Sequence, residues 1–157
     1  MRVIGIDPGT VVCGYGVIDS VGSKMKAVDY GAIRVKQEMT FPERLVFIHQ
    51  GITEVIRRHK PDVAAVEQLF VGKSVRSAMR TGEGRGVAVL TAALENLPVH
   101  EYTPAEVKKA VVGAGRAHKT QVQEMVRIIL ALEKIPKPQD AADALAIAIC
   151  HCQRLVW

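Results

Sequence analysis

Short apolar runs bounded by turn residues begin the chain and predict β-strands. The runs cover residues 2–7, 14–20 and 26–35, and Gly22-Ser23 forms a turn before the third run. Strand-like runs with such short connections are typical of an antiparallel meander. The first part of the chain is therefore expected to form three neighbouring strands of one sheet.

After the third run the hydrophobic period lengthens to about 3.6 residues, which indicates helices. Apolar residues share one helical face between Pro42 and Pro61, and a short buried strand follows at 63–67. A helix between strands indicates a parallel crossover and an α/β fold. The remaining elements are expected to be a helix over 74–96, a strand over 98–102, a helix over 104–112, a helix marked by Val122, Met125, Val126 and Ile129, and a last helix over 139–154.

The helix predicted over 74–96 carries three glycines that should weaken it. Gly82, Gly84 and Gly86 each lower helix stability by about 1 kcal/mol relative to alanine. Either another backbone packs closely against them, within the fold or across a dimer, or the helix is kinked or broken. Its apolar stripe is expected to comprise Val75, Met79, Gly82, Gly86, Val89, Leu90, Ala93 and Leu97.

Length and charge narrow the class of protein. With 157 residues, 48% of them hydrophobic, the chain can fill one core, so we expect a single domain over residues 1–157. Lys and Arg number 21 against 16 Asp and Glu, and a small basic domain favours a polyanionic partner, most often nucleic acid. No secretory signal or membrane-length apolar run is present, which predicts a cytoplasmic protein with reduced cysteines.

Three adjacent residues of the last predicted helix, Cys150, His151 and Cys152, are the residue types that bind zinc. Neighbouring helical side chains diverge, and no second cluster completes a tetrahedral site, which argues against zinc. About 12 Å of helix separates His151 from Asp143. We therefore expect His151 on the surface or at a dimer contact.

Acidic residues stand at two strand ends and at the start of one helix. Asp7 and Glu67 each follow a buried apolar run, and sites gather outside strand ends in open sheets. Asp140 and Asp143 are three residues apart, so they share one face in the first turns of the last helix. Together these positions predict one acidic pocket.

Four converging carboxylates without basic partners would repel one another, and hard divalent cations relieve that repulsion. Two Mg²⁺ ions about 4 Å apart would favour hydrolysis of a phosphodiester. Each acid also has an ordinary interpretation: Asp7 as a turn former with Pro8-Gly9, Glu67 as a salt-bridged strand end, and Asp140 and Asp143 as partners of the helix dipole. Their joint placement favours a site.

Several motifs resemble the RuvC family of Holliday-junction resolvases. They are GIDPG at 5–9, VEQLF at 66–70, EGRGVA at 83–88, EVKKAVVG at 106–113 and DAADALAIA at 140–148. The resemblance implies an RNase H-like fold, a five-stranded mixed sheet flanked by helices. It also implies a homodimer, dependent on Mg²⁺ or Mn²⁺, that resolves four-way junctions in recombination and DNA repair by two symmetric nicks with 5′-phosphate and 3′-hydroxyl ends. The family's catalytic, metal-binding acids fall on Asp7, Glu67, Asp140 and Asp143.

DNA contacts are expected from two further groups of residues. The family places a base-stacking aromatic at Phe70, although an ordinary core phenylalanine is the alternative. Lys73, Arg76 and Arg80 recur at helical spacing after it, and the family resemblance marks Lys108 and Lys119 as lysines near the scissile phosphate. A solvated charged face is the alternative for such basic runs. A branch-migration complex of the RuvA–RuvB type is an expected partner, and the 74–96 helix is the expected dimer contact.

Other functions share part of this pattern. A YqgF-type RNA-processing nuclease shares the opening motif and the acids, and cleavage of structured RNA would distinguish it. Sugar kinases and Hsp70-like ATPases open similarly but need two such domains. A non-catalytic junction binder would not need four intact acids.

Overall fold

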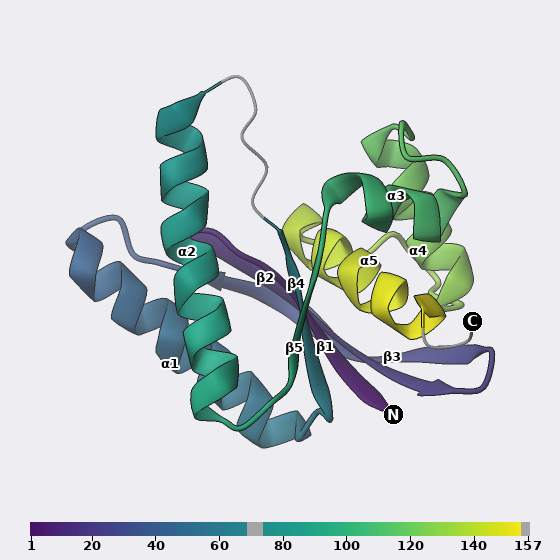
Figure 1. The fold of residues 1–157 in the computed structure, drawn as a ribbon, viewed down its shortest axis with the longest axis horizontal. Helices are drawn as coiled ribbons and strands as arrows, with labels where there is room; N and C mark the ends of the chain where they lie inside the picture. Colours follow the sequence, from purple (N-terminus) through teal and green to yellow (C-terminus); the bar gives the residue numbers. More distant parts are fainter. Residues whose placement is uncertain (69–73, 155–157) are drawn as a thin grey trace.

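The computed structural model describes residues 1–68 and 74–154 and has the predicted α/β architecture. Within these residues a five-stranded sheet has the order β3-β2-β1-β4-β5 (Figure 1). The strands β3, β2 and β1 are antiparallel neighbours, whereas β1, β4 and β5 run parallel. The elements are β1 (Arg2–Asp7), β2 (Val12–Val21), β3 (Lys24–Arg34), α1 (Phe41–His59), β4 (Val63–Glu67), α2 (Val75–Leu94), β5 (Val99–Tyr102), α3 (Pro104–Val112), α4 (Lys119–Ile129) and α5 (Gln139–Arg154).

Helices cover both faces of the sheet. The helices α1 and α2 lie on one face, and α3, α4 and α5 lie on the other (Figure 1). Alternate residues of β1 point to opposite layers, so Ile4 and Ile6 pack toward α1 and α2 whereas Val3 packs toward α5. The mixed five-stranded sheet with two helical layers confirms the predicted RNase H-like fold.

Local signals set the starts of two helices. At α1 the Glu43 carboxylate accepts a hydrogen bond from the Thr40 backbone N–H at 2.7 Å. At α3 the Thr103 hydroxyl accepts from the Glu106 N–H at 3.2 Å, and the Glu106 carboxylate accepts from the Thr103 N–H at 2.8 Å. These bonds satisfy N–H groups that a helix start leaves open, which is why both starts are visible in the sequence.

Glycines in β1 and β2 let α5 lie directly on the sheet. A Cβ added to Gly5 would lie 2.0 Å from the Ala144 carbonyl oxygen, and one added to Gly14 would lie 2.1 Å from the Asp140 carbonyl oxygen. Both distances are far inside van der Waals contact, so only glycine permits this crossing. The crossing places the first turns of α5 against the ends of β1 and β2.

The helix α2 is continuous from Val75 to Leu94, so its three glycines do not break it. Gly84 lies against the backbone of Gly9, where an added Cβ would come within 2.9 Å of the Gly9 carbonyl carbon. This is the close backbone packing that the glycines suggested. Several residues of the expected apolar stripe face away from the sheet: Val75, Met79 and Leu90 are 69%, 63% and 57% exposed.

The expectation that His151 lies on the surface is wrong. Its side chain is 2% exposed, and its Nδ1 lies 2.7 Å from the Tyr102 hydroxyl. Burial lowers the pKa of His151 to about 4, which keeps the imidazole neutral. The flanking Cys150 and Cys152 are buried free thiols, because α5 is enclosed between the sheet and α3. Within the described residues, no helix is long and apolar enough to cross a membrane.

Candidate active site

All four acids that the sequence predicts as a site lie in the lining of one pocket. Its volume is about 390 Å³, and it opens at the carboxyl ends of β1 and β4, between these strands and α3, α4 and α5. The acids therefore converge from three separate stretches of chain. The lining residues are Asp7, Glu67, Pro104, Val107, Lys108, Lys119, Val122, Asp140, Asp143 and Ala146.

Strand register brings Asp7 and Glu67 together. The strands β1 and β4 are parallel neighbours with Ile6 opposite Val66, so the acids that follow lie side by side. The sheet pleat directs both carboxyl groups toward α5, because residues two positions apart share a face. Each acid is the last residue of its strand, and its side chain lines the pocket.

Asp140 and Asp143 reach the pocket from the first turns of α5. Their spacing of three residues places them on one face of the helix. The close contact of the Asp140 backbone with Gly14 of β2 holds that face toward Asp7. The glycine crossing therefore determines how near the two pairs of acids come.

Burial and mutual repulsion raise the pKa values of three acids of the pocket, Asp7, Glu67 and Asp143. Burial raises the pKa of Asp7 to about 8, with further contributions from Glu67, Asp143 and Asp140. Burial also raises the pKa values of Glu67 and Asp143, and in both cases a second acid adds to the effect. Such a cluster retains protons until a cation compensates its charge.

The pocket also contains the two lysines that the family resemblance placed near the scissile phosphate, so the four acids do not converge without basic partners. Lys119 Nζ lies 3.1 Å from Asp143 Oδ2, and this ion pair opposes the rise in the pKa of Asp143. Lys108 lines the same pocket from α3. Two lysines do not neutralise four acids, so a negative excess remains.

The donor set fits a hard divalent cation. Carboxylate oxygens are the ligands that Mg²⁺ prefers, and the acids of this pocket supply them from separate elements. Across residues 1–68 and 74–154, no group of three or more His, Cys, Asp or Glu side chains is already arranged to hold an ion.

Known proteins identify the family. The family model described as "Crossover junction endodeoxyribonuclease RuvC" matches residues 3–151. A relative of that name from Heliobacterium modesticaldum is 50% identical over 157 residues, covering 100% of this chain and 97% of the relative. One from Chloroflexus aggregans is 52% identical over 151 residues, covering 96% and 92%.

The chain belongs to the RuvC family.

Solved structures agree with the family assignment. The structure of T. thermophilus RuvC in complex with a Holliday junction substrate superposes with a TM-score of 0.93 at 36% identity, covering 99% of this chain and 95% of that chain. The fowlpox virus resolvase in complex with Holliday junction DNA has a TM-score of 0.62 at 14% identity, covering 97% and 99%, and shares the fold.

The residues expected to contact DNA in this RuvC-family chain lie in different places. Lys108 and Lys119 line the acid pocket, where they were expected. Arg76 and Arg80 are exposed on α2 and line a second groove on the other face of the sheet. Phe70 and Lys73 lie outside the described residues.

Sequence reasoning missed the apolar wall of the acid pocket. Val107 and Val122 are buried on α3 and α4, and each lines the pocket together with the acids. The signal was present, since both belong to the apolar faces of amphipathic helices. Such an apolar wall lowers the polarity beside the acids, which strengthens electrostatic interactions within the pocket.

The raised pKa of Asp7 predicts how the metal-free protein responds to pH. The folded carboxyl holds its proton up to about pH 8, whereas the unfolded carboxyl ionises near its ordinary pKa of 3.8. The contribution of Asp7 to the free energy of unfolding is therefore greatest below pH 4. It falls as the pH rises toward 8, by at most about 1.4 kcal/mol per pH unit. Urea denaturation in EDTA should show Asp7→Asn gaining stability over the unsubstituted protein at pH 8 but not at pH 4. The same difference in stability between the two proteins at pH 4 and at pH 8 would contradict the raised pKa of Asp7.

Proposed function

We propose that this protein is a metal-dependent endonuclease that resolves four-way DNA junctions by paired symmetric nicks, in recombination and DNA repair. The observation that carries the proposal is the convergence of Asp7, Glu67, Asp140 and Asp143 in one pocket of a RuvC-family chain. The similarity to a RuvC structure with bound junction supports the substrate class. Residues 1–157 would act as one nuclease domain in the cytoplasm.

The four acids would hold Mg²⁺, with Mn²⁺ as the alternative, as two ions in each site. When bound, the metal lowers the pKa of a water and offsets the charge that develops on the phosphate oxygens. Raised pKa values from burial and like charge support this role, because a pocket that resists ionisation gains most from a cation.

The side chains around the acids would position the phosphodiester. Lys108 and Lys119 would donate hydrogen bonds to non-bridging phosphate oxygens from the side of α3 and α4. The wall at Val107 and Val122 would keep bulk water away from the reacting phosphorus. A water oxygen then joins phosphorus while the bond to the 3′ oxygen breaks, which leaves a 5′-phosphate and, once protonated, a 3′-hydroxyl.

A homodimer would provide two such sites in a fixed relation. A junction with near two-fold symmetry requires two related nicks, and a two-fold dimer supplies them. The outward apolar residues of α2, including Leu90 and Leu94, are a suitable contact surface. Phe70, Lys73, Arg76 and Arg80 would engage the DNA near the crossover, and a RuvA–RuvB-type complex would deliver the junction.

Cleavage of a synthetic mobile four-way junction tests the proposal. With Mg²⁺, denaturing gels should map two nicks at symmetry-related positions whose products DNA ligase reseals. A structured RNA of the same length should remain intact. Cleavage of the RNA but not the junction would overturn the proposed substrate, and nicking in EDTA would overturn the proposed chemistry.

Binding of Mg²⁺ should also stabilise the protein measurably. At ten times the dissociation constant, a ligand of the folded state adds about 1.4 kcal/mol, or roughly 3–6 °C in melting temperature. We expect this increase for the unsubstituted protein at pH 8 and little for Asp7→Asn. Differential scanning fluorimetry with NaCl at matched ionic strength separates binding from screening. An equal rise in melting temperature for both proteins would show that the ion binds outside the acid pocket.

A further inference from the structure

A buried hydrogen bond joins β5 to the far end of α5, away from the acid pocket. The Tyr102 hydroxyl and His151 Nδ1 are 2.7 Å apart, and both residues are buried. Tyr102 is the last residue of β5, and His151 lies in the last turn of α5. Either polar group would be costly to bury alone, so the bond favours the one arrangement that satisfies both.

The rest of the buried face of α5 is mostly apolar. Its buried residues between Ala141 and Cys152 are alanine, leucine, isoleucine or cysteine, apart from His151. Apolar side chains tolerate more than one packing arrangement, whereas a buried hydrogen bond specifies one. The glycine crossing at Gly5 and Gly14 holds α5 against β1 and β2. The bond to Tyr102 adds a directional contact with β5, on the other side of the helix end.

Tyr102 also holds the strand that carries Glu67. It lies opposite Glu67 in the parallel pairing of β4 and β5, and its carbonyl oxygen accepts a hydrogen bond from the Gln68 N–H at 2.7 Å. One residue therefore binds the end of β4 through its backbone and α5 through its hydroxyl. An α-helix this short moves as a unit, so a shift at His151 also shifts Asp143, about 12 Å away along the helix.

The start of α3 meets the same residues. Arg154 of α5 pairs with Glu106 of α3 at 2.7 Å, and its guanidinium carbon lies 5.4 Å from the centre of the Tyr102 ring. Glu106 in turn caps α3 together with Thr103, the residue that follows Tyr102. The helix that begins there brings Lys108 to the acid pocket. Three elements that line the pocket, β4, α3 and α5, are therefore joined around Tyr102.

We propose that Tyr102 and His151 are positioning residues for the metal-binding acids, because their hydrogen bond sets Asp143 of α5 relative to Glu67 of β4. The inference rests on the proposed function. Neither side chain lines the acid pocket, so an effect on cation binding must pass through α5 or β4. A bond that only stabilises the core predicts a less stable protein with unchanged Mg²⁺ affinity. A positioning bond predicts weaker Mg²⁺ binding by a protein that stays folded.

Binding of Mg²⁺ in the absence of DNA tests the proposal. Tyr102→Phe removes the hydroxyl and keeps the ring, and isothermal titration calorimetry is run where circular dichroism shows each protein to be folded. We expect the Mg²⁺ dissociation constant to rise about ten-fold, because a misplacement of about 1 Å at a site can reduce activity by about a hundred-fold. The Mg²⁺ concentration that half-saturates junction nicking should rise by the same factor, whereas junction affinity in EDTA should not change.

Substitutions of His151 provide a rescue experiment. Asparagine places a polar atom near the position of Nδ1, so His151→Asn should keep Mg²⁺ affinity within about three-fold, whereas His151→Leu should lose about ten-fold. The double variant Tyr102→Phe/His151→Leu should bind Mg²⁺ no more weakly than His151→Leu alone, because both changes remove the same bond.

Tyr30→Phe is the matched control. It removes a tyrosine hydroxyl from β3, which lies at the opposite edge of the sheet from β5, and Tyr30 packs against the same core as Tyr102. This variant should bind Mg²⁺ with the affinity of the unsubstituted protein. A loss as large as that of Tyr102→Phe would mean that any lost tyrosine hydroxyl weakens the pocket, and the specific role of Tyr102 would be wrong.

The remaining outcomes separate this inference from the proposed function. If Tyr102→Phe and His151→Leu unfold at lower urea concentration yet bind Mg²⁺ normally, the bond only stabilises the core and the proposal is wrong. Mg²⁺ binding by His151→Asn as weak as that of His151→Leu would also overturn it. If the unsubstituted protein neither binds Mg²⁺ nor nicks junctions, the proposed function fails and this inference fails with it.

Discussion

The Asp7→Asn variant should bind four-way junctions normally and nick them at least about a thousand-fold more slowly. Asp7 is the acid on which the other three act together, since Glu67, Asp143 and Asp140 all raise its pKa. Asparagine matches its shape but provides one neutral oxygen, so it weakens cation binding while removing repulsion. Binding is measured by anisotropy in EDTA and nicking on denaturing gels with Mg²⁺.

Asp62→Asn is the matched control for this prediction. Asp62 lies outside the pocket, and its carboxylate accepts a hydrogen bond from the Arg2 N–H, which an asparagine oxygen can also accept. This variant should nick at the unsubstituted rate. Nicking by Asp7→Asn at a similar rate would remove the catalytic role assigned to the pocket.

Gly5→Ala should destabilise the protein by about 3 kcal/mol and abolish most nicking. The added methyl group would lie 2.0 Å from the Ala144 oxygen and 2.8 Å from the Ala148 N atom. These are backbone atoms of α5, so the whole helix must move away from β1. Asp143 then moves away from Asp7 with it. Urea denaturation reports the stability and junction cleavage the activity.

The same substitution at Gly86 provides the contrast. An added Cβ there has no atom within 4 Å, and the residue is exposed on α2. Alanine should therefore stabilise the helix by about 1 kcal/mol through its higher helix propensity. If Gly5→Ala were as stable as Gly86→Ala, the crossing of α5 over β1 would not be as close as described.

The sequence predicts those features that depend on neighbouring residues. Thr40 and Thr103 mark helix starts because their partners lie three residues away. Asp7 and Glu67 were identifiable because an acid after a buried strand is costly to desolvate and therefore unusual. The positions of the acids along their elements were enough to predict one pocket.

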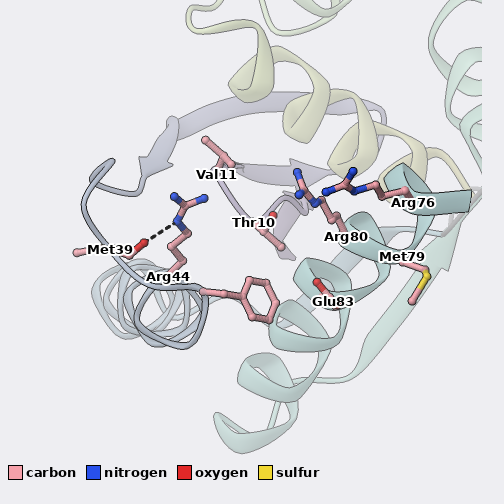
Figure 2. Close-up of a pocket in the computed structure, with 9 residues that line it drawn as sticks. Thr10, Val11, Met39, Arg44, Arg76, Met79, Arg80 and Glu83 are labelled. Atoms are coloured by element: carbon pink, nitrogen blue, oxygen red, sulfur yellow. Dashed lines mark hydrogen bonds between the residues drawn. The ribbon is translucent and has the colours of Figure 1, made fainter. Parts of the chain in front are cut away.

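Contacts between distant segments were not predictable in this way. The Lys119–Asp143 ion pair joins α4 to α5, and nothing in either segment alone indicates it. His151 is buried because α3 and the sheet both enclose α5, whereas spacing along the helix alone suggested a surface position. The groove that Arg76 and Arg80 of α2 line is likewise a contact between distant segments, because Arg44 of α1 lines it too (Figure 2).

The contact between Gly84 and Gly9 gives α2 a pivot beside Asp7. Arg76 precedes Gly84 by eight residues, which is about 12 Å of helix. No side chain separates the two backbones at this contact, so a displacement of α2 there would also displace the turn that follows Asp7. The position of Asp7 therefore depends on how α2 is seated, as well as on the strand that carries it.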